Sequence, residues 1–244
     1  MSAPLFLVDE ARLRDDPIVL DGDEGRHAAV VRRIRIGERV DLGDGAGQVA
    51  RCVVSDASRS GLVCRVESRY AEPPPSPRLV VVQALPKGDR ALAAVEMLTE
   101  VGADVIVPWT AARCVVRWSG ERADKALARW RSTAREAAKQ SRRAWVPEVT
   151  DPASTDRVAT VLGSAELSVV LHEAAERPLA SLAVPTGGDV VLVVGPEGGI
   201  DDRELAGFAD AGAQPVRLGS SVLRTSTAGV AAAAALLSRT PRWA

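Results

Sequence analysis

The chain has 244 residues, 46% of them hydrophobic, which is enough apolar sequence for the core of one large or two modest domains. Its formal net charge of −1 at pH 7 argues against a surface that attracts nucleic acid over its whole extent, so local charge is more informative than the sum. Aromatic residues make up only 3% of the chain, so aliphatic side chains must fill the core.

Cysteine and histidine are too sparse and too dispersed to suggest a metal centre. Cys52, Cys64 and Cys114 are odd in number and lack CxxC spacing, while His27 and His172 lie far apart. We therefore expect no zinc or iron site, and reduced thiols in a cytoplasmic protein. The N-terminal sequence MSAPLFLVDEARLR lacks a basic stretch before a long apolar one, and no apolar run reaches about 18 residues, so neither a signal peptide nor a membrane span is expected.

Residues 1–70 are predicted to form a small β-barrel, because short apolar segments alternate with turn sequences such as DGDEG and GDGAG. The expected strands are Leu5–Val8, Ile18–Leu20, Arg39–Leu42, Gln48–Val54 and Leu62–Glu67. The proline-rich sequence AEPPPSP at 71–77 predicts a stiff linker. The first domain is therefore expected at 1–70 and the second at 78–244.

The sequence HAAVVRRIRIGERV at 27–40 predicts a short helix with His27, Val30, Val31 and Ile34 on one face. Arginines surround this helix, with the single acid Glu38 among them: Arg26, Arg32, Arg33, Arg35 and Arg39. A solvated basic face accounts for them without any function, and a face that contacts RNA is the alternative. We expect the histidine to pack at the start of the helix, with a catalytic role as the alternative.

An α/β domain is predicted from residue 78 onward. LVVVQAL at 79–85 has the continuous apolar character of a buried strand, positions 92, 95, 98 and 101 follow a helical period that Gly102 ends, and Asp104–Val107 returns as a strand. Between 113 and 143, ten basic residues stand against three acids. An amphipathic helix whose arginines face solvent would account for this segment without any function. The excess of positive charge instead favours a surface that faces phosphates.

Two strand–loop–helix units follow one another in 190–238. The strand at 190–194 ends at GPEGG (195–199), a helix covers 202–211, a short strand ends at Leu218, and the loop that Gly219 opens leads to an alanine-rich helix. Both loops leave the carboxyl ends of their strands, where open α/β sheets bind ligands. Neither loop matches a phosphate-binding motif, and Glu197 would repel a phosphate. A ligand with a purine edge, a ribose and a cationic centre fits better, and a plain tight turn is the alternative.

Four blocks of sequence, in order along nearly the whole chain, resemble the ribosomal RNA small subunit methyltransferase E family, a member of the SPOUT class. They are HAAVVR with DGAG, the segment KGDRALAAVEMLTEVGADVIVP, the segment AKQSRRAWVP, and GPEGG followed by LGSSVLRTSTA. The chain departs from the family at Ser226, where glutamate is common, and at Glu173, where a proline is usual. The resemblance implies a SPOUT-type α/β domain with a C-terminal trefoil knot, preceded by a PUA-like β-barrel.

The resemblance also implies a site for S-adenosylmethionine, whose expected residues are Leu171, His172, Gly195, Pro196, Glu197, Gly198, Gly199, Ile200, Leu218, Gly219, Val222, Leu223, Arg224 and Thr225. For His172, a structural cap is the alternative. The expected catalytic residues are Arg224, Arg113 and Glu197, with orientation of the loop as the alternative for Glu197. The expected RNA-binding residues are Arg26, Arg32, Arg33, Arg113, Arg142 and Arg143.

The implied activity is methylation of N3 of a uridine in 16S rRNA, on the small ribosomal subunit, by a cytoplasmic homodimer joined through its C-terminal domain. N3 lies on the Watson–Crick edge, so the target must be unpaired or flipped. Two other readings stay open at this point: a non-catalytic RNA-binding protein, and an enzyme of the same class that methylates tRNA.

Overall fold

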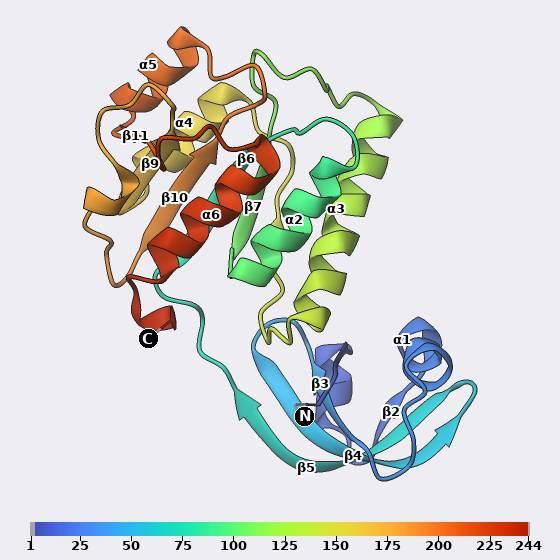
Figure 1. Ribbon diagram of the computed structural model, residues 1–244. Coiled ribbons are helices and arrows are strands. Elements are labelled where there is room, and N and C mark those ends of the chain that lie inside the picture. Colours follow the sequence, from blue (N-terminus) through green and yellow to red (C-terminus); the bar gives the residue numbers. More distant parts are fainter. Residues whose placement is uncertain (1–2, 244) are drawn as a thin grey trace. The chain divides into compact units, whose positions relative to one another are not determined.

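The computed structural model describes residues 3–243 and divides into two compact units (Figure 1). The N-terminal unit comprises Met1–Pro74 together with Ala138–Val146, and the second unit comprises Pro75–Ala137 together with Pro147–Ala244. The first unit therefore takes in a segment that follows more than 60 residues of the second, which no sequence pattern indicated.

The N-terminal unit is built on a five-stranded sheet in the order β1-β3-β4-β5-β2. The strands are β1 (Leu5–Leu7), β2 (Ile18–Leu20), β3 (Arg39–Gly43), β4 (Gln48–Ser58) and β5 (Gly61–Ala71). Strands β1 and β3 pair in parallel and the other neighbours pair antiparallel. All five strands lie where the sequence predicted them. Strands β1 and β2 stand at the two ends of the strand order. One face encloses a core that includes Phe6, Ile18, Val40, Leu42 and Leu62.

The helical segment of this unit differs from its prediction. It begins earlier, as α1 (Gly22–Arg26), and continues as the π-helical turn η2 (His27–Val31). The expected apolar face is wrong, because the side chains of Val30 and Val31 are 50% and 66% exposed. The buried positions are Gly25 and Ala28.

Small residues are needed on this face because the helix backbone lies directly on β2. A Cβ atom at Gly25 would lie only 2.3 Å from the carbonyl oxygen of Leu20. His27 is half-buried and its ring meets the ring of Phe6 edge to face, with 6.4 Å between the centroids. This contact agrees with the packed role expected for the histidine.

The segment Ala138–Val146 is attached to the N-terminal unit by backbone and side-chain bonds. Gly47 N–H donates to the Ala144 carbonyl at 3.1 Å, and the indole Nε1–H of Trp145 donates to the Glu72 carbonyl at 3.0 Å. Lys139 Nζ lies 2.7 Å from Glu24 Oε1, and the side chains of this ion pair are only 9% and 20% exposed. These bonds hold Arg142 and Arg143 within the N-terminal unit.

The second unit contains a six-stranded parallel sheet in the order β11-β9-β10-β6-β7-β8. Its strands are β6 (Arg78–Ala84), β7 (Val105–Trp109), β8 (Glu148–Val149), β9 (Leu167–Leu171), β10 (Asp189–Val194) and β11 (Gln214–Val216). Strands β6 and β10 are almost entirely buried, because helices cover both faces of the sheet. The predicted α/β domain is confirmed.

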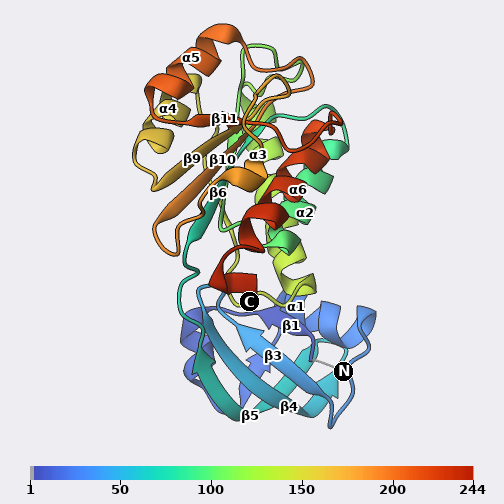
Figure 2. The same ribbon diagram turned by 60° about the vertical axis from the view of Figure 1, so that its left-hand side comes forward.

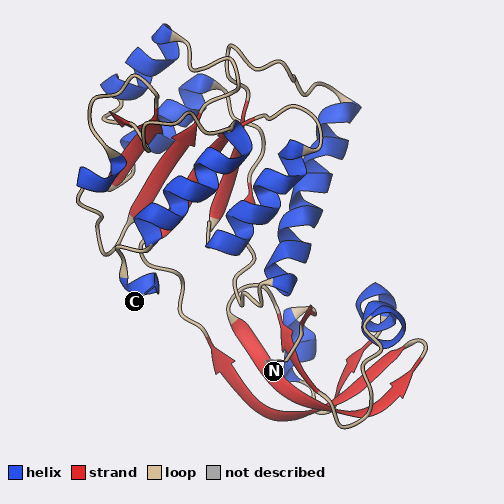
Figure 3. Ribbon diagram, viewed as in Figure 1, coloured by secondary structure: helices blue, strands red, loops and turns tan. Residues whose placement is uncertain are grey.

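Five helices cover this sheet: α2 (Arg90–Val101), α3 (Glu121–Gln140), α4 (Thr155–Gly163), α5 (Asp202–Asp210) and α6 (Thr225–Leu237). Figures 2 and 3 show α2 and α6 side by side on one face, with α4 and α5 on the other. The short 3-10 turns η3 (Leu179–Ser181) and η4 (Pro241–Trp243) complete the unit. Among the described residues, none of the helices combines the length and apolarity that a membrane span requires.

A buried ion pair attaches the C-terminal turn to the sheet. Arg242 Nη1 lies 2.6 Å from Asp104 Oδ2, and the two side chains are 14% and 7% exposed. The guanidinium also donates to the carbonyl oxygens of Pro77 and Gly102, and Asp104 accepts the N–H of Leu79 at 2.8 Å. The pair thus joins η4 to the edges of β6 and β7.

We expect Arg242→Met to lower the free energy of unfolding by about 3 kcal/mol, because it leaves the Asp104 carboxylate buried without its cation. Urea unfolding followed by tryptophan fluorescence measures this. The control is Arg157→Met, since that side chain is exposed on α4 and forms no ion pair within the described residues. The control should change stability by less than about 0.5 kcal/mol, and equal effects of the two variants would contradict the assignment.

Candidate functional site

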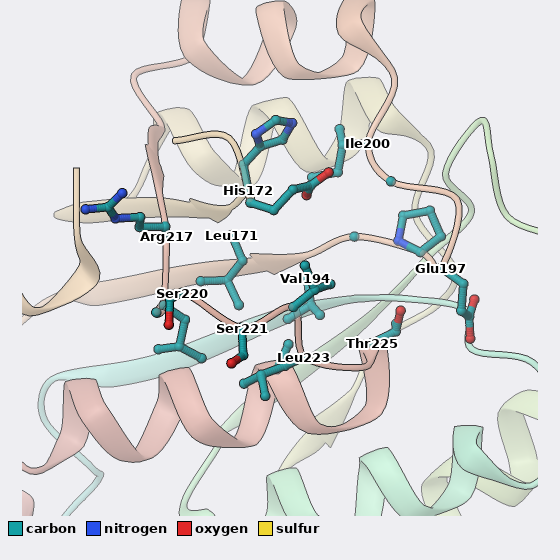
Figure 4. A pocket seen from close by; sticks show the side chains of 18 residues that line it. Leu171, His172, Val194, Glu197, Ile200, Arg217, Ser220, Ser221, Leu223 and Thr225 are labelled. Carbon is teal, nitrogen blue, oxygen red and sulfur yellow. The ribbon is translucent and has the colours of Figure 1, made fainter. Parts of the chain in front are cut away.

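A cavity of about 440 Å³ lies in the second unit, where the carboxyl ends of β9, β10 and β11 meet (Figure 4). Three chain segments form its walls. The lining residues are Leu171, His172, Glu173, Val194, Gly195, Pro196, Glu197, Gly199, Ile200, Arg217, Leu218, Gly219, Ser220, Ser221, Val222, Leu223, Thr225 and Ala228. This is the edge of the sheet at which the sequence predicted a ligand site.

The GPEGG loop turns back on itself directly after β10. A Cβ atom at Gly195 would lie 2.7 Å from Cγ1 of Ile200, so only glycine lets the chain pass the isoleucine side chain. Gly199 has a φ of +75°, which glycine adopts readily, and its N–H donates to the Pro196 carbonyl at 2.9 Å. The loop is therefore a compact turn that presents Pro196 and Glu197 at the cavity.

The wall that follows β11 is fixed by backbone bonds to the segment after β9. Arg217 N–H donates to the Arg177 carbonyl at 2.9 Å, and Leu179 N–H donates to the Arg217 carbonyl at 2.8 Å. From Gly219 to Leu223 the chain is exposed, with Val222 81% exposed, and α6 then begins at Thr225. This wall is therefore hydrogen-bonded at Arg217 and exposed to solvent from Gly219 to Leu223.

Twelve of the fourteen residues expected around the cofactor line this cavity; Gly198 and Arg224 do not. A Cβ atom at Gly198 would lie 3.1 Å from the carbonyl oxygen of Arg113 and 3.2 Å from its Cβ. The resemblance implied a place for this glycine at the cofactor, whereas its tight contact is with the segment that follows β7. The two loops pack closely at this point, so a larger residue would require the Arg113 backbone to shift by a few tenths of an ångström.

Sequence reasoning missed six lining residues: Glu173, Val194, Arg217, Ser220, Ser221 and Ala228. Each is a direct neighbour of the motif residues or lies one helical turn beyond them. Arg217 is the most consequential omission, because it adds a cation to the cavity wall. In Figure 4, Arg217 and Glu197 lie at opposite sides of the view, so the cavity carries charges of both signs.

The three expected catalytic residues stand in different environments. Glu197 lines the cavity and its Oε1 accepts the backbone N–H of Lys87 at 3.3 Å, which supports the orienting role. Arg113 is about half exposed, and its Nη2 lies 3.6 Å from Asp201 Oδ2. The side chain of Arg224 is exposed next to the cavity and forms no ion pair within residues 3–243.

A buried carboxylate joins the loops around the site. Glu204, on α5, is 6% exposed, and its Oε1 accepts the N–H of Ala112 at 2.8 Å and the hydroxyl of Thr155 at 2.9 Å. Its Oε2 accepts the N–H of Asp201 at 3.2 Å, which completes a capping box at the start of α5. One side chain therefore holds the segment next to Arg113, the start of α4 and the end of the GPEGG loop.

Five of the arginines expected to bind RNA belong to the N-terminal unit, and Arg113 belongs to the second. The five are Arg26, Arg32, Arg33, Arg142 and Arg143, and all but Arg143 are exposed. Near Arg142, burial raises the pKa of the Asp41 carboxyl, while the charges of Arg51 and Arg142 oppose that shift. These five arginines therefore belong to the unit that does not contain the cavity, whereas Arg113 belongs to the unit that does.

Family models match both units. One described as an RNA methyltransferase domain matches residues 73–237, and one described as an RNA methyltransferase PUA domain matches residues 20–67. The chain is 51% identical over 247 residues to the ribosomal RNA small subunit methyltransferase E of Mycobacterium tuberculosis, covering 100% of this chain and 94% of the relative. It is 30% identical to the protein of that name from Bacillus subtilis, with 89% and 88% covered.

The fold agrees with a solved structure over nearly its whole length. A ribosomal RNA small subunit methyltransferase E from Neisseria gonorrhoeae, bound to S-adenosylmethionine, superposes with a TM-score of 0.83 at 27% identity. The match covers 97% of this chain and 98% of that one.

We expect Glu204→Ala to destabilise the second unit by about 2 kcal/mol, because two backbone N–H groups and a hydroxyl lose their acceptor in a partly dry site. Glu204→Gln keeps one oxygen for Ala112 and Thr155 and loses only the bond from Asp201, so about half that loss is expected. Chemical denaturation of the two variants tests this order. Equal stability of both variants and the wild type would show that the carboxylate does not join these loops.

Proposed function

The chain belongs to the ribosomal RNA small subunit methyltransferase E family and is an S-adenosylmethionine-dependent methyltransferase of 16S rRNA, and we propose that it acts on N3 of a uridine. The full-length identity of 51% to a relative of that name carries the assignment. The cavity supports it, because its walls are the segments that carry the family's C-terminal motifs.

The groups around the cavity fit S-adenosylmethionine. Leu171, Val194 and Ile200 offer an apolar wall to the purine, and the Glu197 carboxylate can accept hydrogen bonds from the ribose hydroxyls. The guanidinium of Arg217 can pair with the carboxylate of the methionine part. When bound, the cofactor supplies a methyl group that its sulfonium already activates.

The protein has two tasks in this reaction: to place N3 of the uracil in line with the methyl group, and to stabilise the negative charge left on the ring when N3 loses its proton. We assign the second task to Arg224, because it lies in sequence between Leu223 and Thr225, which both line the cavity, and its exposed side chain forms no ion pair within the described residues. The backbone of Arg113 packs against Gly198 of the GPEGG loop, and its side chain is a candidate contact for RNA phosphate. Glu197 orients the loop after β6.

RNA binding is proposed for five arginines of the N-terminal unit, which act on phosphates irrespective of sequence: Arg26, Arg32, Arg33, Arg142 and Arg143. The match of residues 20–67 to a PUA domain of RNA methyltransferases supports this. The proposed domains along the sequence are 1–70, with the linker 71–77, and 78–244, and the segment Ala138–Val146 of the second range belongs structurally to the N-terminal unit. The proposed substrate is 16S rRNA within the small ribosomal subunit, in the cytoplasm.

A trefoil knot is proposed for the C-terminal part of the second unit. It is supported by the meeting of three segments at one cavity, 171–173, 194–200 and 217–228. The guanidinium of Arg239, after α6, donates to the carbonyl oxygens of Leu179 and Leu182, so the end of the chain holds the segment that follows β9.

A homodimer through the second unit is also proposed. Ala231 and Ala234 on α6 are only half-buried, and Val222 in the loop before α6 is exposed, so the helix and this loop have apolar surface that the core does not fully cover. Sedimentation equilibrium tests this proposal, and a monomer at micromolar concentration would remove it.

The activity is tested by transfer of labelled methyl from S-adenosylmethionine to small ribosomal subunits that lack the modification, with bulk tRNA as a parallel substrate. We expect label in 16S rRNA and none in tRNA. Label in tRNA alone would reassign the substrate. Absence of transfer to either RNA, with S-adenosylmethionine bound, would contradict the proposed reaction.

Arg224→Ala should lower kcat about 100-fold, because one preorganised donor to the charged transition state is lost. Its Kd for S-adenosylmethionine should stay within about twofold of wild type. Timed assays of small-subunit methylation provide kcat, and calorimetry provides the Kd for S-adenosylmethionine. An unchanged kcat would remove Arg224 from the reaction.

Gly198→Val should weaken S-adenosylmethionine binding roughly tenfold, because the added carbons push the GPEGG loop off the Arg113 backbone. The control is Gly207→Ala on α5, where an added Cβ meets nothing within 4 Å. Calorimetry should find wild-type affinity for the control. Wild-type affinity of Gly198→Val would show that packing against Arg113 does not shape the cavity.

A further inference from the structure

A second cavity, of about 310 Å³, lies in the N-terminal unit between the 3-10 turn η1 (Glu10–Arg14) and the start of β4. Its apolar wall is formed by Leu13, Val49 and Ala50, which are 6%, 3% and 0% exposed. Glu10, Arg14, Gln48 and Arg69 complete the lining. None of these residues belongs to the cavity of the second unit, and no role has been assigned to any of them.

The cavity is held in shape by Arg69. Its Nε donates to the Leu13 carbonyl at 2.8 Å and its Nη2 donates to the Asp15 carbonyl at 2.6 Å, so η1 is attached to β5. On the other side, the backbone N–H of Gln48 donates to Asp44 Oδ1 at 3.0 Å. Both walls are therefore fixed before any ligand arrives, which lowers the entropic cost of binding.

Two polar groups at this cavity are available to a ligand. The side-chain amide of Gln48 is exposed and makes no hydrogen bond to another described residue. Arg14 Nη2 pairs with Glu10 Oε1 at 2.8 Å, but the side chains are 78% and 67% exposed, so water screens this pair and it contributes little. The guanidinium can exchange that carboxylate for a phosphate.

We propose that this cavity binds one unpaired nucleotide of the RNA substrate. The base packs on the exposed apolar atoms of Leu13 and Val49, the Gln48 amide bonds to the base edge with its donor and its acceptor, and Arg14 binds an adjacent phosphate. The volume suits one small ligand and not a duplex. The inference rests on the proposed action on rRNA and adds a second RNA contact outside the methyl-transfer site.

A substitution at Glu10 should change RNA affinity in the direction opposite to a substitution at Arg14. The Glu10 carboxylate competes with RNA phosphate for Arg14, so Glu10→Gln should bind RNA more tightly while Arg14→Gln binds more weakly. A side chain that acted only in folding would not strengthen binding when it is changed.

The test measures binding of the full-length protein to unmodified, transcribed 16S rRNA by filter retention over a range of salt concentrations. Arg14→Gln should weaken binding about fivefold and reduce the slope of log K against log salt by about 0.7, because one phosphate contact is lost. Gln48→Ala should weaken binding about fivefold with an unchanged slope, since an amide releases no counterion. Arg59→Gln is the control, because Arg59 is exposed in the β4–β5 turn outside the cavity.

Wild-type affinity in both Arg14→Gln and Gln48→Ala would overturn the inference, as would equal effects of Arg14→Gln and the control. Weaker binding to whole small subunits alone, with wild-type binding to free rRNA, would also overturn it, because the cavity would then contact a ribosomal protein. Methyl transfer by the wild type is measured in parallel. Absence of methyl transfer would contradict the proposed reaction. The binding measurements would still test the proposal for the cavity.

Discussion

Strand β10 is hydrogen-bonded to β6 on one side and to β9 on the other, and this pairing determines where the site lies. Val190 stands opposite Leu79 of β6 and Leu167 of β9. Because these strands and β11 run parallel, their carboxyl ends meet at one edge, and the loops that leave them form one cavity. A shift of one residue in this register would displace the GPEGG loop by about 3.3 Å relative to the opposite wall.

The Glu204 carboxylate adds a second constraint behind that edge. It joins the segment after β7 to the start of α5, and the contact of Gly198 with Arg113 closes the same interface. The GPEGG loop is therefore held by groups that do not line the cavity. This separates residues that contact the ligand from residues that set the position of the loop.

The strands and the edge of the sheet at which the cavity lies were predictable because their signals are local. Continuous apolar runs, glycine stops and proline punctuation lie within a few residues of the elements that they specify. The contact of Gly198 with Arg113, the helix packing at Gly25 and the return of Ala138–Val146 to the N-terminal unit were not predictable. The first and the last join residues far apart in sequence. The packing of Gly25 on the carbonyl of Leu20 depends on backbone geometry that no periodicity records.

The number of basic residues in the sequence predicted only part of the charge distribution on the protein. The basic excess in 113–143 suggested one surface facing phosphates, but ion pairs occupy part of it: Arg113–Asp201, Lys125–Glu121, Arg131–Asp151 and Lys139–Glu24. The division of the chain also assigns Arg142 and Arg143 to the same unit as Arg26, Arg32 and Arg33. Arginines that appear as two clusters in the sequence therefore belong to one RNA-binding unit in our proposal.

The central claim is that the cavity at the ends of β9, β10 and β11 directs the methyl group to one atom of a uridine. The most direct measurement is mass spectrometry of nucleosides from 16S rRNA after reaction of the purified protein with unmodified small subunits. The account predicts N3-methyluridine as the single new nucleoside, absent from reactions with Arg224→Ala stopped at the same early time. Methylation of another base, or of a ribose hydroxyl, would contradict it.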